Sequence, residues 1–165
     1  MDVEKIILRN QTLAWERLCA LLGNEEDASD CLQDVVVTFL EIAHEQKTSN
    51  PDGLFSTLTY RTAIDLLRSR KDEKKLHKSL AERVTNESPK PGPLDKLLDE
   101  ELLESFRCAL AILSDSEAEV FCLWLFDDLP YKKIAKKLNL KAGNVGVMLH
   151  RSKEKLGFRL CKLLK

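Results

Sequence analysis

The side chains best suited to molecular recognition lie near the C-terminal end of the chain. Asn144, Val147, Met148 and Arg151 recur at intervals of three and four residues, so they share one face of a helix. Asn and Arg can hydrogen-bond to base edges, whereas Val and Met make only apolar contact, for instance with a thymine methyl group. Nearby lysines are suited to phosphate contacts that set register: Lys141, Lys153 and Lys155. This face therefore predicts contact with duplex DNA.

The elements that must position this face form a helix-turn-helix pattern. A short helix over 130–138 and a longer one over 142–163 are separated by Asn139-Leu140-Lys141, and the second would enter the major groove. Pro130 is expected at the first helical position. A basic amphipathic helix in a plain bundle would explain the charge, but not the breaks between helices. The expected small core is Ile134, Ala135, Leu138, Leu140, Val145 and Leu149.

The rest of the chain also has helical periodicity and shows no strand signal. Helices are expected over 3–22, ended by Gly23, over 27–43 with Asp27 near its N-terminus, and from Leu54 past Arg70. Residues 48–53 have loop chemistry, and the polar stretch 71–93 ends in SPKPGP, which is typical of a linker. Ser114 and Glu117 fit a capping box that begins a helix to about Phe126.

The predicted fold class is all-α, with two small helical domains joined by a flexible linker. The expected boundaries are 1–75 for the first domain, 76–95 for the linker and 96–165 for the domain with the helix-turn-helix.

The charges are segregated along the chain, although the 165 residues sum to a net charge of −1. Residues 18–46 hold seven acidic residues and no Lys or Arg, and 95–128 hold ten acidic and two basic residues. Residues 61–78 hold seven basic and three acidic residues, and 129–165 hold eleven basic and one acidic residue. This pattern favours different faces for different partners; the alternative is solvated faces that happen to cluster.

Other classes of protein lack support in the sequence. Five scattered cysteines form no CxxC pattern, which predicts reduced thiols and no metal site. Three scattered histidines, with neither a glycine-rich phosphate loop nor a paired nucleophile and base, predict neither an enzyme nor a cofactor. No apolar run approaches the roughly 20 residues that span a bilayer, and the first residues do not read as a signal peptide. A cytoplasmic protein without membrane insertion is expected.

The run from Leu113 to Leu156 resembles region 4 of bacterial sigma factors, which reads the minus-35 promoter element. The resemblance implies DNA contacts from Lys141, Asn144, Val147, Met148, Arg151 and Lys155. The sequence departs from the family at Pro130 and Lys141, near which Ser or Thr caps are usual, and at 146–148, where polar or basic residues are common. The base contacts of the family therefore do not transfer directly. Matching positions are Leu113, Glu119, Val120, Phe121, Leu129, Tyr131, Ile134, Ala135, Leu138, Val145, Leu149, His150, Arg151 and Leu156.

The segment DASDCLQDVVVTFL resembles region 2 of the same family. The matching positions include Asp27, Asp30, Gln33 and Asp34, of which the last three share one helical face. In the family this face docks on core RNA polymerase, so the resemblance implies that these four residues bind core polymerase. The alternative is an ordinary solvated acidic face.

The segment GLFSTLTYRTAIDLLRSRK resembles the promoter-melting and minus-10 part of region 2, through Ala63, Ile64, Asp65, Leu67 and Arg68. A family Trp is replaced by Leu54, and Arg61 stands where Asn is frequent. Phe55 and Tyr60 can stack on bases, but both have core positions as the alternative. The residues implied in minus-10 contact are Thr48, Ser49, Asn50, Tyr60, Arg61 and Arg68.

Together the two resemblances identify a two-domain sigma factor of the extracytoplasmic-function type. They imply binding to core RNA polymerase, promoter recognition, DNA melting and transcription initiation, with promoter DNA as the second partner and an anti-sigma protein as a candidate third. Two alternatives stay open: a helix-turn-helix regulator that acts without polymerase, and a sigma-like decoy that only binds proteins.

Overall fold

The computed structural model describes residues 2–45, 49–81 and 94–163, and their side chains except those of 77–81, 94–99 and 158–163. In the described residues all regular structure is helical, so the all-α prediction is confirmed. The helices are α1 (Val3–Leu22), α2 (Glu25–Glu45), α3 (Pro51–Ala81), α4 (Leu94–Leu110), α5 (Asp115–Leu125), α6 (Tyr131–Lys137) and α7 (Ala142–Leu163).

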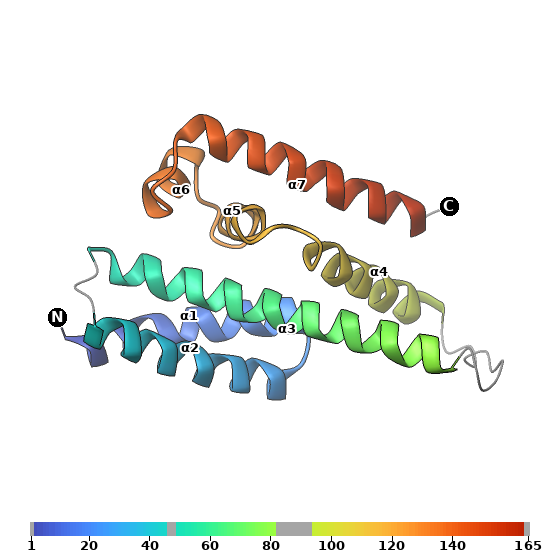
Figure 1. Ribbon diagram of the computed structural model, residues 1–165, viewed down its shortest axis with the longest axis horizontal. Helices are drawn as coiled ribbons and strands as arrows, with labels where there is room; N and C mark the ends of the chain where they lie inside the picture. Colours follow the sequence, from blue (N-terminus) through green and yellow to red (C-terminus); the bar gives the residue numbers. More distant parts are fainter. Residues whose placement is uncertain (1, 46–48, 82–93, 164–165) are drawn as a thin grey trace.

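Helices α1, α2 and α3 pack side by side as an N-terminal body (Figure 1). Gly23, with φ of 68°, ends α1 as expected, because only glycine adopts the left-handed region at little cost. The Oδ1 atom of Asn24 accepts hydrogen bonds from the amides of Glu26, at 2.8 Å, and Asp27. Asn24 is therefore the cap of α2, which begins two residues before the predicted start and places Asp27 in its first turn.

Helix α3 is longer at both ends than predicted. Residues 51–53 are helical rather than a loop, because Asn50 Oδ1 accepts the Gly53 amide at 3.0 Å and Pro51 occupies the first helical position. The helix continues to Ala81, and α4 begins at Leu94. Residues 76–81 and 94–95, expected in the linker, are thus helical, and 82–93 lie outside the described residues.

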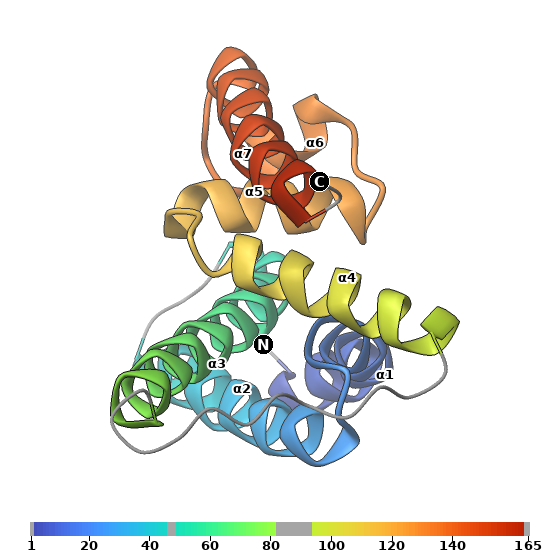
Figure 2. The same ribbon diagram turned by 90° about the vertical axis from the view of Figure 1, so that its right-hand side faces the viewer.

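Helices α4 to α7 form a second layer, with α4 and α5 next to the N-terminal body and α7 farthest from it (Figures 1 and 2). The capping box of Ser114 and Glu117 is present at the start of α5, as predicted. Helix α5 ends at Leu125, because the chain turns at Phe126 and passes through a left-handed conformation at Asp128.

The two layers share one hydrophobic core. Buried side chains of the N-terminal body, among them Leu21, Tyr60 and Ile64, belong to the same cluster as Leu110 and Leu123 of the second layer. A smaller cluster around Phe39 and Phe55 lies within the N-terminal body alone. The structure has the two helical bodies that the sequence predicts, and apolar side chains of α3 pack against the second of them.

Candidate nucleic-acid interface

The helix-turn-helix predicted from the sequence is formed by α6 and α7. Ile134, Ala135, Val145 and Leu149 are buried between them, and Leu138 and Leu140 pack against this core. The turn passes through Asn139 at a φ of 54°, and the Leu140 amide donates to the Ala135 carbonyl at 2.8 Å. Asn is one of the few residues other than glycine that tolerates this conformation, which explains its place in the turn.

Helices α6 and α7 begin close to the predicted positions, although the usual Ser or Thr caps are missing. Pro130 is extended and precedes α6 without a side-chain hydrogen bond, so it is the N-cap rather than the first helical residue. Its carbonyl accepts the amides of Lys133 and Ile134, and the carbonyl of Lys141 accepts those of Asn144 and Val145. The backbone alone therefore starts both helices.

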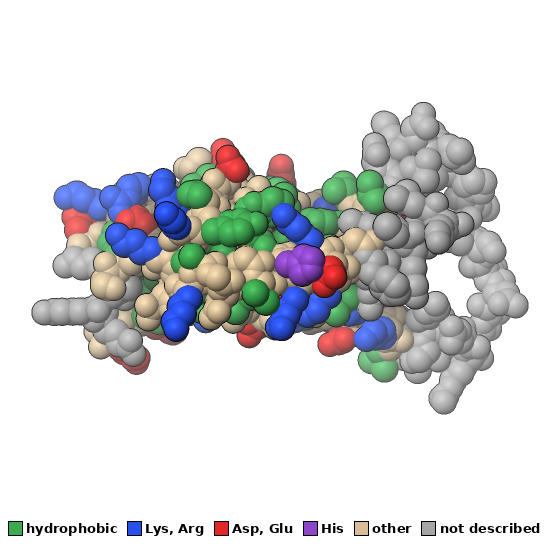
Figure 3. Space-filling model, turned by 90° about the horizontal axis from the view of Figure 1, so that it is seen from above, with side chains coloured by type: hydrophobic (Ala, Val, Ile, Leu, Met, Phe, Trp, Pro, Cys, Tyr) green, Lys and Arg blue, Asp and Glu red, His purple; other side chains and the backbone are tan. Residues whose placement is uncertain are grey.

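The predicted DNA-reading face of α7 is presented to solvent. Asn144 and Arg151 are exposed, Val147 is 51% exposed, and Met148 is half-buried. Figure 3 shows this side of the molecule, with exposed hydrophobic side chains in its middle. A Cβ atom added at Gly146 would lie 3.8 Å from the Tyr131 ring, which is ordinary contact, so the glycine is not required there.

Several side chains near this face were not assigned to DNA contact from the sequence, although His150 is among the positions that match the family. His150 lies beside Val147 on α7 and pairs with Glu154 at 3.6 Å, both largely exposed. On α6, Lys132, Lys133 and Lys136 are exposed, and Lys and Arg side chains gather at this end of the molecule in Figure 3. Helical spacing from Val147 would have found His150, whereas the α6 lysines were visible only as part of a charge count.

Two lysines expected to contact phosphates are exposed but also contact α5. Lys155 Nζ lies 2.6 Å from Glu117 Oε2, and Lys153 Nζ lies 3.9 Å from the centroid of the Trp124 ring. Burial alone would raise the pKa of Glu117, but hydrogen bonds from Lys155 and from the Ser114 amide hold it below its ordinary value. Lys155 thus neutralises a buried carboxylate of α5. All three lysines are exposed, and Lys141 is the one of them that has no such contact with α5.

The acidic face of α2 is exposed, as its pattern predicts. Asp30, Gln33 and Asp34 face solvent, while Asp27 is half-buried and forms an ion pair with Arg70. Asp27, Asp30 and Asp34 line a groove of about 560 Å³ between α2 and α3. Asp65 adds a fourth carboxylate, and the remaining walls are apolar, thiol and hydroxyl side chains: Cys31, Val37, Thr38, Thr62, Leu66 and Ser69. The groove suits a partner with basic residues around an apolar centre.

The residues implied in minus-10 contact are placed very differently from one another. Ser49 and Asn50 are exposed next to the start of α3, and Asn50 also caps that helix. Thr48 lies outside the described residues. Tyr60 is fully buried and donates its hydroxyl hydrogen to Asp127, so in this arrangement its ring has no access to a base, which corrects that expectation.

Arg61 and Arg68 are already engaged with the second layer. Arg61 pairs with Glu119 of α5. Arg68 lies 2.6 Å from Asp115 and donates to the Leu113 carbonyl at 2.7 Å, and it also pairs with Asp65. Both guanidinium groups thus contact α5, although the Arg61 side chain is still 56% exposed.

A buried ionic network at Asp127 links the two layers and gave no local signal in the sequence. Arg17 of α1 lies 2.7 Å from the Asp127 carboxylate, and Lys137 of α6 lies 3.6 Å from it. Burial, together with the neighbouring Asp127 carboxylate, raises the pKa of Tyr60, so its hydroxyl stays protonated as a donor. Burial also lowers the pKa of Lys137, against the opposing pull of Asp127.

Other chemistry finds no support among the described side chains. They contain no group of three or more His, Cys, Asp or Glu residues placed to hold a metal ion. The four described cysteines are free thiols, and burial raises the pKa of Cys31 to about 11, which keeps it a poor nucleophile. No helix among the described residues is long and apolar enough to cross a membrane.

The fold and these surfaces define an all-helical DNA-binding protein with a C-terminal helix-turn-helix. Residues 103–156 match the family described as Sigma-70, region 4. This part of the chain is similar to sigma-70 region 4, as the resemblance implied. The sequence matches no curated relative.

The fold of the whole chain is similar to that of a solved structure. It is similar to the sigma factor RpoE from Bartonella quintana, whose structure was solved in complex with the anti-sigma factor NepR. The TM-score is 0.53 at 20% identity, and the similarity covers 96% of each chain.

Proposed function

We propose that this protein is a sigma factor of the extracytoplasmic-function type that directs core RNA polymerase to promoters. The observation that carries the proposal is the combination of a region 4 helix-turn-helix with a three-helix body whose α2 exposes Asp30, Gln33 and Asp34. A DNA-binding regulator needs only the first of these, whereas a protein that bridges polymerase and promoter needs both.

The α2 groove is the proposed site for core polymerase. Its four carboxylates, Asp65 of α3 included, would steer a basic helical partner, and Val37, which is 53% exposed, would give that partner an apolar contact. Asp27 serves mainly to hold Arg70, so Asp30 and Asp34 are the more important contacts.

The outward face of α7 is the proposed minus-35 reader. Arg151 and Asn144 offer hydrogen bonds to guanine and adenine, and Val147 offers contact with a thymine methyl group. Lys141 and the exposed lysines of α6 would position the helix on the phosphates. The N-terminal body is proposed to contact the minus-10 region through Ser49, Asn50, Arg61 and Arg68. These contacts would lead to DNA melting and transcription initiation.

An anti-sigma protein is proposed as a further partner. The support is the structural similarity to a sigma factor that was crystallised with such a protein. The chain would act in the cytoplasm, where core polymerase and DNA are found.

Run-off transcription with core polymerase across genomic fragments tests the proposal. We expect start sites that depend on this protein, at a small set of fragments. If no start site rises above the level with core enzyme alone, the protein is not a sigma factor; duplex binding in that case would indicate a helix-turn-helix regulator, and its absence a protein-binding decoy.

A further inference from the structure

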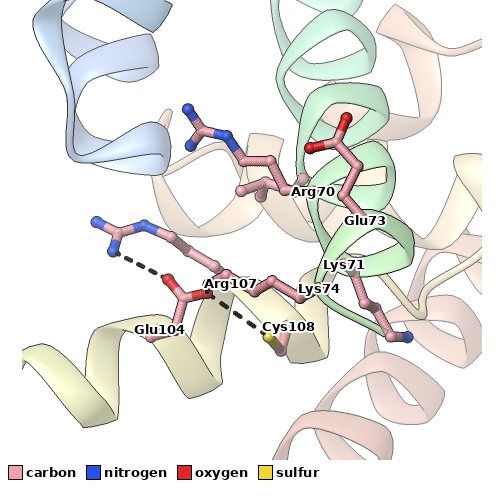
Figure 4. Close-up of a pocket in the computed structure, with 8 residues that line it drawn as sticks. Arg70, Lys71, Glu73, Lys74, Glu104, Arg107 and Cys108 are labelled. Atoms are coloured by element: carbon pink, nitrogen blue, oxygen red, sulfur yellow. Dashed lines mark hydrogen bonds and ion pairs between the residues drawn. The ribbon is translucent and has the colours of Figure 1, made fainter. Parts of the chain in front are cut away.

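The basic side chains of this protein have two kinds of surroundings. Figure 4 shows the first kind, in the cleft between α3 and α4. There Lys74 pairs with Glu104 of α4. Arg107 Nε donates to the Leu21 carbonyl at 2.8 Å, and Arg70 forms an ion pair with α2. These three cations have their counter-charges or acceptors within the chain, so this cleft is a poor candidate for recognition of a second molecule.

The outward face of α6 and α7 has the opposite composition. Figure 3 shows hydrophobic side chains in the middle of this face, with Lys and Arg side chains around them. Lys132, Lys133 and Lys136 are exposed on α6, and Arg151 is exposed on α7. The first eight residues of α7, AGNVGVML, contain no charged side chain. They belong to the stretch 129–165, which holds eleven basic residues and one acidic residue, so the apolar centre contrasts with the composition around it.

Tyr131, Gly146 and Val147 form the centre of this face. Val147 is 51% exposed, and Tyr131, the first residue of α6, is 42% exposed. A Cβ atom built on Gly146 would lie 3.8 Å from the Tyr131 ring, so the ring lies beside the bare backbone of α7. Glycine disfavours a helix, but a bare backbone lets a ligand approach closely. We call these three residues the Tyr131–Gly146–Val147 surface.

The major groove of DNA presents one apolar group to such a surface, the 5-methyl group of thymine. Guanine, cytosine and adenine are distinguished there by hydrogen bonds, and Asn144 has the only side chain in residues 142–149 that is suited to make them. Recognition helices contact base edges mainly through their N-terminal residues. The residues of α7 that would enter the groove first are therefore suited to methyl groups more than to hydrogen-bonding edges.

We propose that the Tyr131–Gly146–Val147 surface reads thymine methyl groups, so that the DNA element bound by α7 contains thymine opposite Val147. The inference rests on the proposed function, which places α7 in the major groove of a promoter. The surrounding cations favour DNA as the occupant over an apolar protein, because a helix in the major groove has phosphates on both sides. The departure from the family at 146–148 is then a change of sequence preference rather than a loss of DNA binding.

The test replaces thymine by uracil, which removes the methyl group and leaves the hydrogen-bonding groups of the base unchanged. The probe is the best run-off promoter fragment, bound by the full chain together with core polymerase. If run-off transcription finds no promoter, the probe is the duplex that the full chain alone selects from a pool of random sequence. Each thymine of the bound element is replaced in turn, and competition gel shifts give the relative affinities.

Two variants assign the effect to the apolar surface. Val147→Ser removes both methyl groups of an exposed side chain. Leu8→Ser is the matched control, because Leu8 is 57% exposed on α1, in the N-terminal body. Circular dichroism checks that both variants keep the helicity of the wild type.

We expect at least one position at which uracil weakens binding of the wild type about fourfold, as burial of a single methyl group predicts. Leu8→Ser should show the same loss at the same position. Val147→Ser should bind the thymine duplex about fourfold more weakly and should no longer distinguish thymine from uracil there.

Equal affinities for thymine and uracil at every position would overturn the proposal, as would the lack of any bound duplex. A loss with uracil that is unchanged in Val147→Ser would also overturn it, because the methyl group would then act elsewhere or through the shape of the duplex. Start sites in run-off transcription without an effect of uracil would reject the methyl contact alone. A selected duplex that loses affinity with uracil only when Val147 is present, without any start site, would reject the sigma-factor function alone.

Discussion

Helices α2 and α5 both lie in acidic stretches of the sequence that contain few Lys or Arg residues, but their carboxylates have different surroundings. Asp30 and Asp34 of α2 face solvent, along a groove. Glu117 and Glu119 of α5 are buried, and with Asp127 just beyond the helix they pair with cations of α7, α3 and α1. The comparison shows that a block of like charge indicates a partner but does not say whether that partner is another molecule or another part of the same chain.

The same division applies to the cations of α7. Arg151 points outward, whereas Lys153 and Lys155 lie against α5. Charged side chains that pair across the helices should therefore govern the stability of the fold. Charged side chains that face solvent should govern binding to other molecules.

The largest expected effect is on stability. Asp127→Asn should lower the free energy of unfolding by about 3 kcal/mol, because it leaves Arg17 and Lys137 without their buried counter-charge. Asp34→Asn, on the outward face, should change it by less than about 0.5 kcal/mol. Urea denaturation followed by the fluorescence of Trp15 and Trp124 measures both. Equal losses would contradict the division into inward and outward charges.

The next effect is on sequence-specific DNA binding. Arg151→Ala should weaken binding to the best run-off promoter fragment by about 2 kcal/mol, roughly thirtyfold, and relax specificity at one position. Lys155→Ala should weaken it less than about threefold, because Lys155 is held on Glu117. Competition gel shifts against mutated fragments give both values. A larger loss for Lys155 than for Arg151 would show that the lysine leaves Glu117 on binding.

Charge reversal on the outward face of α2 should affect polymerase binding alone. Asp30→Lys with Asp34→Lys should weaken the complex with core polymerase about tenfold, through lost steering and repulsion. A control with Glu16→Lys and Glu100→Lys changes the net charge equally at exposed sites elsewhere. Pull-down titration with core enzyme gives the affinities. If the two double variants bind alike, the docking face lies elsewhere.

The smallest effect is the pH dependence at Glu117. Its pKa in the folded protein lies below the ordinary value of 4.5, so its stabilising contribution is present above that pH and is lost as the pH falls through the folded pKa. Glu117→Gln should therefore cost about 1 kcal/mol at neutral pH, through the capping box and Lys155. In urea denaturation, the difference from wild type should disappear as the pH falls through the folded pKa. A constant difference from neutral to acid pH would show that the charge of Glu117 is not what stabilises the protein.

Much of the fold could be predicted because its signals are local. The bounds of α1 and α7, the capping box at Ser114 and the core of the helix-turn-helix follow from periodicity and capping within a few residues. The errors have local causes as well. Asn24 and Asn50 are caps that were not recognised, so α2 and α3 begin earlier than expected.

The candidate site was predicted less completely. Helical spacing was enough to place Asn144, Val147 and Arg151 on an exposed face, and Asp30, Gln33 and Asp34 on another. It also placed Lys155 near the DNA-reading face, although that lysine pairs with Glu117, 38 positions away in the sequence. No pattern within one helix could have paired Lys155 with Glu117, because the two side chains meet only when α7 packs on α5.

The sequence by itself determined the helices, their caps, the helix-turn-helix and the segregation of charge, since each depends on neighbouring residues and their hydrogen bonds. Only the tertiary structure decided which charged faces stay open. Arg61 meets Glu119 across 58 positions, and Tyr60 meets Asp127 across 67. Such pairs form because the apolar face of α3 packs against α5, and burial of that face, rather than any local signal, chooses the charges that come together.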